Sequence, residues 1–280
     1  MLTDKQQRII EGMFKTIKKR YRYASILLRQ LVATDFKLRY QGSVLGYMWS
    51  LLRPLAIFVI LYIVFTRFLR IGDNIPHYPV YLLLGIVLWN FFVEVTTGSV
   101  AVIVAKGDLM RKINFPKYVI ILSGSVSALI NLMLNLLVVL LFMFISGVDF
   151  RFAGFIFPIL IVELFMFAMS IGFFLSTAFV RFRDVGYIWE VITQAAFYAT
   201  PILYPLSLVP IRYAKILILN PIAQIIQDSR YVLISDQTQT ISSLYSNSLI
   251  RLIPIAIVGA TVALSIVYFK KRSRYFAEEV

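Results

Sequence analysis

The stretch RDVGYIWEVITQAAFYATPILYP, residues 183–205, is the most informative part of this chain. It is long and apolar enough to enter a bilayer, which takes about 20 mainly apolar residues in a helix. Within it, Glu190, Gln194 and Tyr198 recur at four-residue spacing, which stacks them on one helical face. A polar and aromatic stripe on a membrane helix usually faces a protein interior or a water-filled path. The segment therefore points to transport.

Composition sets the fold class. The chain is 60% hydrophobic and only 15% charged, far from the balance of a soluble domain. Six segments have the length and apolar content of a membrane span: 46–69, 78–104, 118–145, 154–180, 187–205 and 249–269. Several of these runs have almost no polar interruption, which excludes a large soluble core. We predict an all-α membrane protein with six transmembrane helices.

The basic residues are distributed unevenly along the chain. Twenty of the 28 Lys and Arg lie in residues 1–45, 105–117, 181–186 and 270–274, whereas the opposite connections hold seven. Cytoplasmic loops carry such an excess, so both termini are predicted in the cytoplasm, with an even number of spans. A basic tail next to anionic lipid also accounts for the net charge of +14 without nucleic acid as a partner.

Two segments outside the spans have their own patterns. Residues 1–45 are expected to form cytoplasmic and interfacial helices, since 25–40 has a roughly helical apolar period with a cationic face; a plain solvated helix is the alternative. Between spans five and six, an apolar run is cut by Asn220-Pro221 into halves too short to cross. We predict a re-entrant hairpin over 207–234 that dips in from outside, with a loop on the membrane surface as the alternative. The transmembrane domain would then cover 46–270, with a cytoplasmic tail over 271–280.

Several kinds of chemistry find no support in the sequence. There is no cysteine, His77 is the only histidine, and no G-x-x-x-x-G-K-[ST] phosphate-binding loop occurs. No catalytic residue, metal site or cofactor bound by this chain is expected. Three acids fall inside predicted spans, Glu94, Glu163 and Glu190, and they leave a proton-coupled carrier open as an alternative.

Two predicted spans carry polar stripes, and the connection between them has a mixed pattern of its own. Glu94 shares a helical face with Asn90 and Thr97, which favours an interior position, while the stripe Ser127, Asn131 and Asn135 suits helix packing. The inner connection KGDLMRKINFPK, residues 106–117, mixes charged with apolar side chains. That mixture fits either a short helix docking into a partner's groove or a simple amphipathic connector.

Four segments together resemble a known family. They are LRYQGSVLGYMWSLLRPL (38–55), RKINFPK (111–117), Arg183-Asp184 with FYATPILYP (197–205), and LNP (219–221) followed by Arg230-Tyr231. In this order they resemble the membrane subunit of ABC-2-type exporters, and within that class the polysaccharide branch that exports O-antigen, teichoic acid or capsule. The likeness covers most of the chain.

The resemblance implies a homodimer in the bacterial cytoplasmic (inner) membrane, as a multi-pass protein that is not itself an enzyme. Two cytoplasmic ABC ATPase subunits would bind ATP and Mg, and the cargo would be a glycan on a polyprenyl diphosphate. An exporter of a drug, peptide or lipid is the main alternative.

It also implies roles for individual residues. The coupling contact with the ATPase would involve Lys106, Asp108, Leu109, Met110, Arg111 and Phe115. The channel between the protomers would be lined by Tyr47, Trp49, Phe58, Glu190, Gln194, Phe197, Tyr198 and Tyr204. Arg39, Arg53, Arg181 and Arg183 would receive the lipid diphosphate; contact with membrane phospholipid is the alternative for each.

Overall fold

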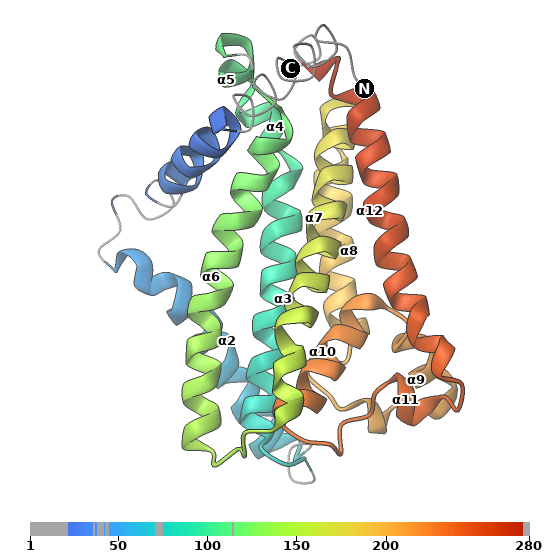
Figure 1. The fold of residues 1–280 in the computed structure, drawn as a ribbon. Helices are drawn as coiled ribbons and strands as arrows, with labels where there is room; N and C mark the ends of the chain where they lie inside the picture. The colour runs from blue at the N-terminus through green and yellow to red at the C-terminus, as the bar shows by residue number, and fades with distance from the viewer. Residues whose placement is uncertain are drawn as a thin grey trace, which may run out of the picture.

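The computed structural model describes residues 22–35, 37, 42, 45–70, 75–113 and 115–276. Within these residues all regular secondary structure is helical, which confirms the predicted all-α class. Long helices run side by side, and short helices gather at the two ends of the bundle (Figure 1).

The helices follow one another with short connections. The long ones are α2 (Trp49–Ile63), which continues into the π-helical η2 (Val64–Phe68), α3 (Tyr78–Val100), α6 (Tyr118–Ile145), α7 (Phe157–Arg181), α8 (Val185–Ala199) and α12 (Leu252–Arg272). The short ones are η1 (Gly46–Met48), α4 (Val102–Ala105), α5 (Gly107–Lys112), η4 (Phe152–Ile156), η5 (Leu206–Leu208), α9 (Ile211–Leu217), α10 (Pro221–Leu233), α11 (Ile241–Leu244) and η6 (Ser248–Arg251).

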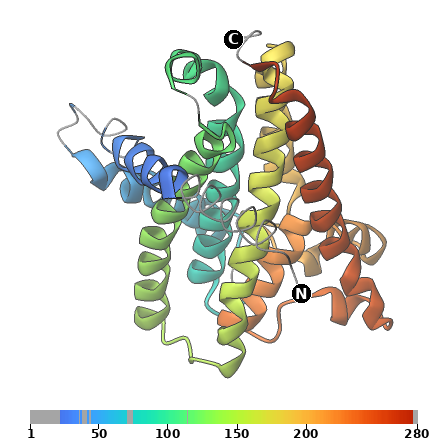
Figure 2. The same ribbon diagram turned by 45° about the horizontal axis from the view of Figure 1, so that its top comes forward.

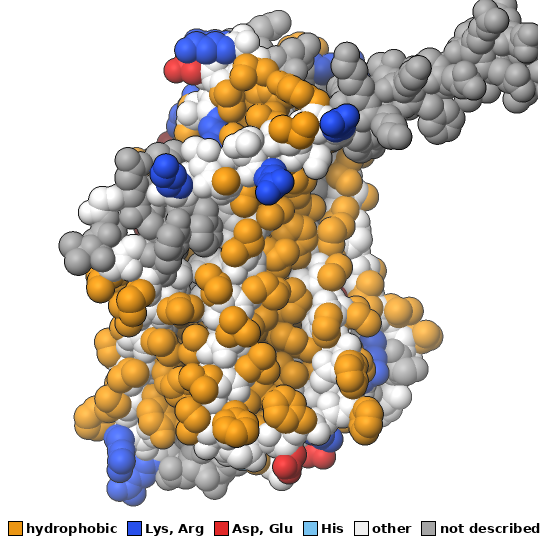
Figure 3. Space-filling model, turned by 60° about the vertical axis from the view of Figure 1, so that its left-hand side comes forward, with side chains coloured by type: hydrophobic (Ala, Val, Ile, Leu, Met, Phe, Trp, Pro, Cys, Tyr) orange, Lys and Arg blue, Asp and Glu red, His pale blue; other side chains and the backbone are white. Residues whose placement is uncertain are grey.

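Five helices of the described chain are long and apolar enough to cross a membrane: Trp49–Phe68, Tyr78–Val100, Tyr118–Ile145, Phe152–Arg181 and Leu249–Arg272. They lie where five of the six spans are predicted. Figure 3 shows one face of the molecule, on which hydrophobic side chains cover the middle and most of the visible Lys and Arg lie toward the two ends. Such a surface suits a lipid bilayer.

The remaining predicted span, 187–205, differs in length from the helix observed there. Helix α8 ends at Ala199, because Pro201 pushes the preceding Thr200 out of the helical region to φ −89° and ψ 138°. With 15 residues, α8 provides about 22 Å of helix. Residues 200–205 continue without helix, and the Tyr204 hydroxyl donates to the carbonyl oxygen of Tyr198 at 3.2 Å.

Helix α3 is the centre of the bundle. Of its most hydrophobic stretch 78% is buried, against at most 33% for the other four candidate spans. It packs against α2, α6, α7, α8 and α10. In Figure 1, α6 lies to one side of it and α7 and α12 to the other.

The predicted hairpin region folds into two short helices, α9 and α10. They are separated at Asn220, whose side chain caps α10 by accepting from the backbone N–H of Ile222 at 3.1 Å. Ten of the thirteen residues of α10 are buried, because the helix is inserted between α3, α7 and α12.

Arg230 joins α10 to the segment that follows α8. Its fully buried guanidinium donates to the carbonyl oxygens of Tyr81 (3.0 Å), Pro201 (2.7 Å) and Ile202 (2.7 Å). It also lies 3.5 Å from the centroid of the Tyr81 ring, a cation–π contact. These bonds fix the chain between α8 and η5 against α3.

A separate cluster closes the opposite end of the bundle. The helix over residues 22–35 lies at an angle to the long helices there (Figure 2). Its Ala24, Leu27, Leu28 and Leu31 belong to one apolar cluster with the end of α12 and the start of α6. Lys106 pairs with Asp35 at 2.8 Å, so this helix is also attached to the connection between α4 and α5.

Candidate functional site

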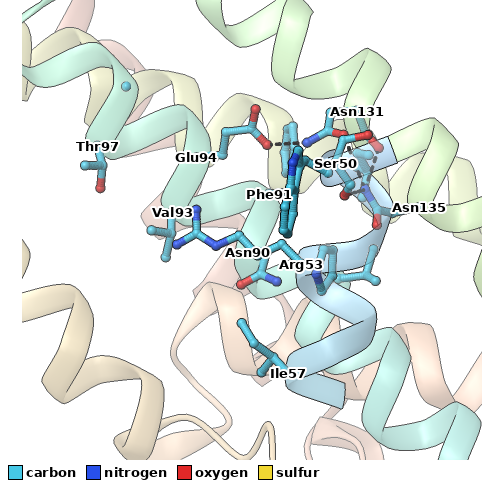
Figure 4. Close-up of a pocket in the computed structure, with 15 residues that line it drawn as sticks. Ser50, Arg53, Ile57, Asn90, Phe91, Val93, Glu94, Thr97, Asn131 and Asn135 are labelled. Carbon is cyan, nitrogen blue, oxygen red and sulfur yellow. Dashed lines mark hydrogen bonds between the residues drawn. The ribbon is translucent and has the colours of Figure 1, made fainter. Parts of the chain in front are cut away.

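A polar cavity of about 540 Å³ lies between α2, α3 and α6. Figure 4 shows Arg53 of α2, Asn90, Glu94 and Thr97 of α3, and Asn131 and Asn135 of α6 around it. The rim is exposed at Trp49, Arg53 and Thr97. Polar side chains from three helices therefore surround one open space on one side of α3.

Hydrogen bonds order one wall of this cavity. The Asn131 amide donates to Glu94 Oε2 at 2.8 Å. The Asn135 amide donates to the Asn131 carbonyl oxygen at 2.9 Å and to the backbone oxygen of Ser50 at 3.4 Å. The two polar stripes predicted separately on α3 and α6 thus face each other. A wall of carboxylate, carboxamides and a guanidinium, with Trp49 beside it, can exchange hydrogen bonds with hydroxyl groups.

Helix α3 lies between this cavity and α8. It presents Asn90, Glu94 and Thr97 to the cavity, while Phe92 packs on Trp189 of α8 at 6.2 Å between ring centroids. The Trp189 indole N–H also donates to Thr96 Oγ1 at 3.2 Å. The cavity and α8 therefore lie on opposite faces of the same helix.

The predicted polar stripe of α8 points away from the protein. Glu190 and Gln194 are exposed, and Tyr198 is 66% exposed. The only buried residue of α8 is Thr193. A single protomer therefore leaves this polar face uncovered.

The other predicted channel residues lie in different surroundings. Trp49 is 51% exposed at the cavity rim, and Phe197 is half-buried against Trp89 at 5.9 Å between centroids. Phe58 is only 3% exposed and packs edge-on against Phe142 of α6 at 5.5 Å, so its side chain lies inside the protomer in this structure. The side chain of Tyr47 lies outside the described residues.

The predicted coupling segment forms helix α5 with two distinct faces. Asp108 and Arg111 are exposed, and Leu109 is half-buried. Met110 and Phe115 are buried in the apolar cluster with Ile103 and Val119, so their side chains pack inside the protomer in this structure. Lys106 is engaged by Asp35.

The four predicted phosphate-binding arginines do not form one group in the described structure. Arg53 lines the polar cavity. Arg181 and Arg183 are exposed at the α7–α8 connection, over the rings of Phe182 (5.3 Å) and Phe179 (5.2 Å). Arg39 lies outside the described residues. Among the described arginines, Arg230 makes the most interactions of those the structure shows. The sequence marks it only as part of the resemblance, and the hydropathy pattern does not indicate that it is buried.

Comparison with known proteins finds relatives named for O-antigen export and for polysialic acid transport. An O-antigen export system permease protein of Myxococcus xanthus is 28% identical over 270 residues, which is 96% of this chain and 100% of that protein. One from Klebsiella pneumoniae is 29% identical over 268 residues, 94% of this chain and 99% of the relative. A polysialic acid transport protein of Escherichia coli is 24% identical over 208 residues, 73% of this chain and 80% of the relative. The family described as ABC-2 type transporter matches residues 26–234, and the chain belongs to that family.

Proposed function

We propose that this chain is the membrane subunit of an ATP-driven exporter that moves a polysaccharide across the bacterial cytoplasmic membrane. The observation that carries this proposal is the end-to-end similarity to O-antigen export permeases, which spans 94–96% of the chain. The chain itself is not an enzyme. A separate ABC ATPase subunit would bind ATP and Mg and supply the energy.

The topology is part of the same proposal. We place α4, α5 and the end of α12 in the cytoplasm, because Lys106, Arg111 and Lys112 lie at the same end of the bundle as Lys270–Arg272 (Figure 1). Helix α8 would be the fifth of six spans, completed across the bilayer by residues 200–205. The helices α9 and α10 would then form the hairpin that re-enters from the outer side.

A homodimer would give the exposed polar face of α8 its environment. A charged carboxylate such as Glu190 is costly in lipid, and so is the amide of Gln194. Facing a second protomer across a hydrated path removes that cost. The path would then be lined by α8 and, from the other face of α3, by the polar cavity, with Trp49 and Tyr198 offering aromatic faces to sugar rings.

The cargo is proposed to be a glycan on a polyprenyl diphosphate. The cavity supplies carboxamide, carboxylate and guanidinium groups, which suit the many hydroxyls of a sugar chain. Arg181 and Arg183 are exposed at the proposed cytoplasmic end of α8, where they would meet the diphosphate.

Photo-cross-linking tests this function. A photoreactive residue is placed at position 90 in the cavity, at 194 on α8, or at 137 on the exposed side of α6. The complex with its ATPase is then given radiolabelled lipid-linked glycan. Positions 90 and 194 should cross-link, position 137 should not, and the glycan should stimulate ATP hydrolysis. Stimulation by a drug or free lipid, with no glycan cross-link at either position, would contradict the polysaccharide assignment.

A further inference from the structure

A second large groove lies on a different side of the bundle. It has a volume of about 700 Å³ and is formed by the start of α6, one side of α7 and the last turns of α12. Its walls are apolar and include Met166, Met169, Phe173, Val262, Ile266 and Phe269. Phe173 and Phe269 meet edge-on at 4.9 Å between centroids and form a rigid part of the wall.

The groove has a cationic rim at one end. Lys117, Lys270 and Arg274 are its charged lining residues, and all three are basic. Lys117 Nζ donates to the backbone oxygen of Ser273 at 2.5 Å, which holds its ammonium group between α6 and α12. Helix α6 begins at Tyr118, so the positive end of a 28-residue helix lies at the same rim.

The apolar walls continue away from this rim along the helices. They extend from Phe269 to Val262 on α12 and from Phe173 to Met166 on α7. Seven residues of helix on each side correspond to about 10 Å. The shape is that of a site for an amphiphile, with an anionic group at the rim and an alkyl chain along the walls.

We propose that this groove binds an anionic phospholipid of the cytoplasmic leaflet, with its phosphate between Lys117, Lys270 and Arg274 and one acyl chain against α7 and α12. Charge complementarity selects an anionic headgroup over a zwitterionic one. No residue of α8 and none of the residues named for the polar cavity lines the groove. The ligand is therefore a resident lipid and not cargo on the proposed path, and only the choice of leaflet depends on the proposed topology.

Native mass spectrometry of the full-length chain with its ATPase tests the site. Phosphatidylglycerol and phosphatidylcholine with identical acyl chains are titrated separately, and inorganic phosphate is added as a competitor. We expect a saturable preference for phosphatidylglycerol that millimolar phosphate does not remove, because the acyl chain contributes to binding. In the double variant Lys270→Gln/Arg274→Gln, the dissociation constant for phosphatidylglycerol should rise about thirty-fold, because each basic residue contributes about 1 kcal/mol to binding.

The chain offers a matched control. Lys271→Gln/Arg272→Gln removes two charges from the same segment at positions that do not line the groove, and it should change the dissociation constant less than about threefold. Met169→Trp keeps every charge and fills the apolar part, so it should also weaken phosphatidylglycerol binding, by about tenfold. Retained binding of the ATPase shows that each variant is folded.

Three results would overturn the lipid site. If both double variants lost the same affinity for phosphatidylglycerol, the binding would be general attraction by a basic tail and not a site. Equal affinity for phosphatidylglycerol and phosphatidylcholine would contradict the proposed contact between the basic residues and an anionic headgroup. Displacement of phosphatidylglycerol by an equimolar polyprenyl diphosphate would assign the groove to the substrate carrier.

Discussion

At the scale of single residues, the close approach of Gly85 to Arg230 predicts a large effect of one substitution. A Cβ atom on Gly85 would lie 2.4 Å from Arg230 Nη2, so Gly85→Ala must displace the guanidinium from its carbonyl partners. Hydrogen bonds to a charged group contribute roughly 1.5–3 kcal/mol each, so we expect a loss of about 2–4 kcal/mol in unfolding free energy. Gly98→Ala on the same helix meets nothing within 4 Å and should be neutral or stabilising. Thermal unfolding of the purified variants measures both, and equal melting temperatures would refute the role of Arg230.

Also at the residue scale, substitution of Glu94 distinguishes an ATP-driven exporter from a proton-coupled carrier. In an ATP-driven exporter its side chain serves as a hydrogen-bond acceptor for Asn131 and as a contact for cargo, so Glu94→Gln should keep at least half of the export rate. Glu94→Leu removes the polar contact and should lower export about tenfold. Export is measured as surface glycan in cells that contain the ATPase. Complete loss in Glu94→Gln would instead favour the proton-coupled carrier.

At the scale of elements, the two faces of α5 predict opposite behaviour. Arg111→Glu reverses an exposed charge and should leave the melting temperature unchanged while weakening binding of the ATPase about tenfold, since charge complementarity is lost at a contact. Met110→Glu places a charge where the side chain is 8% exposed and should lower the melting temperature itself. Co-purification of the ATPase with each variant, together with thermal unfolding, distinguishes the two. Normal ATPase binding by Arg111→Glu would place the coupling contact elsewhere.

The elements also show what the sequence could predict. The positions of five long helices follow from hydropathy, and the break at Asn220-Pro221 follows from proline chemistry. The end of α8 at Ala199 follows from Pro201 by the same rule, although the predicted span ran past it. The burial of Phe58 could not be predicted, because it depends on a contact with Phe142 of α6, a helix far away in the sequence. Aromatic rings on a membrane helix look alike whether they face lipid, protein or a path.

At the scale of the whole molecule, hydropathy does not rank helices by burial. Helix α3 has the lowest mean hydropathy of the five candidate spans, 1.7, and yet is the most buried. In a bilayer, lipid tails are as apolar as leucine, so an interior helix gains nothing from being more hydrophobic than its neighbours. Its polar residues, such as Asn90 and Glu94, are tolerated because other helices and the cavity surround them. The central position of α3, and with it the shared cavity, therefore depends on packing that the sequence pattern does not encode.

The complete topology can be tested directly, because the chain contains no cysteine. Single cysteines replace the exposed residues Asp108 on α5, Lys271 at the end of α12, and Asp149 and Gln237 in the connections at the other end. A membrane-impermeant thiol reagent added to intact spheroplasts should label positions 149 and 237. Positions 108 and 271 should react only after permeabilisation.

The same reagent decides whether α8 crosses the membrane. Asp184 and Ser207 flank α8 and its extension, and both are exposed. With six spans, a cysteine at 207 is labelled from outside and one at 184 is protected, since 15 residues of helix and the segment after it must together bridge a hydrocarbon core of about 30 Å. Labelling of both from one side would leave five spans and place position 271 outside. The basic residues at the ends of α7 and α12 would then lie on opposite sides of the membrane, against the charge rule on which the orientation rests.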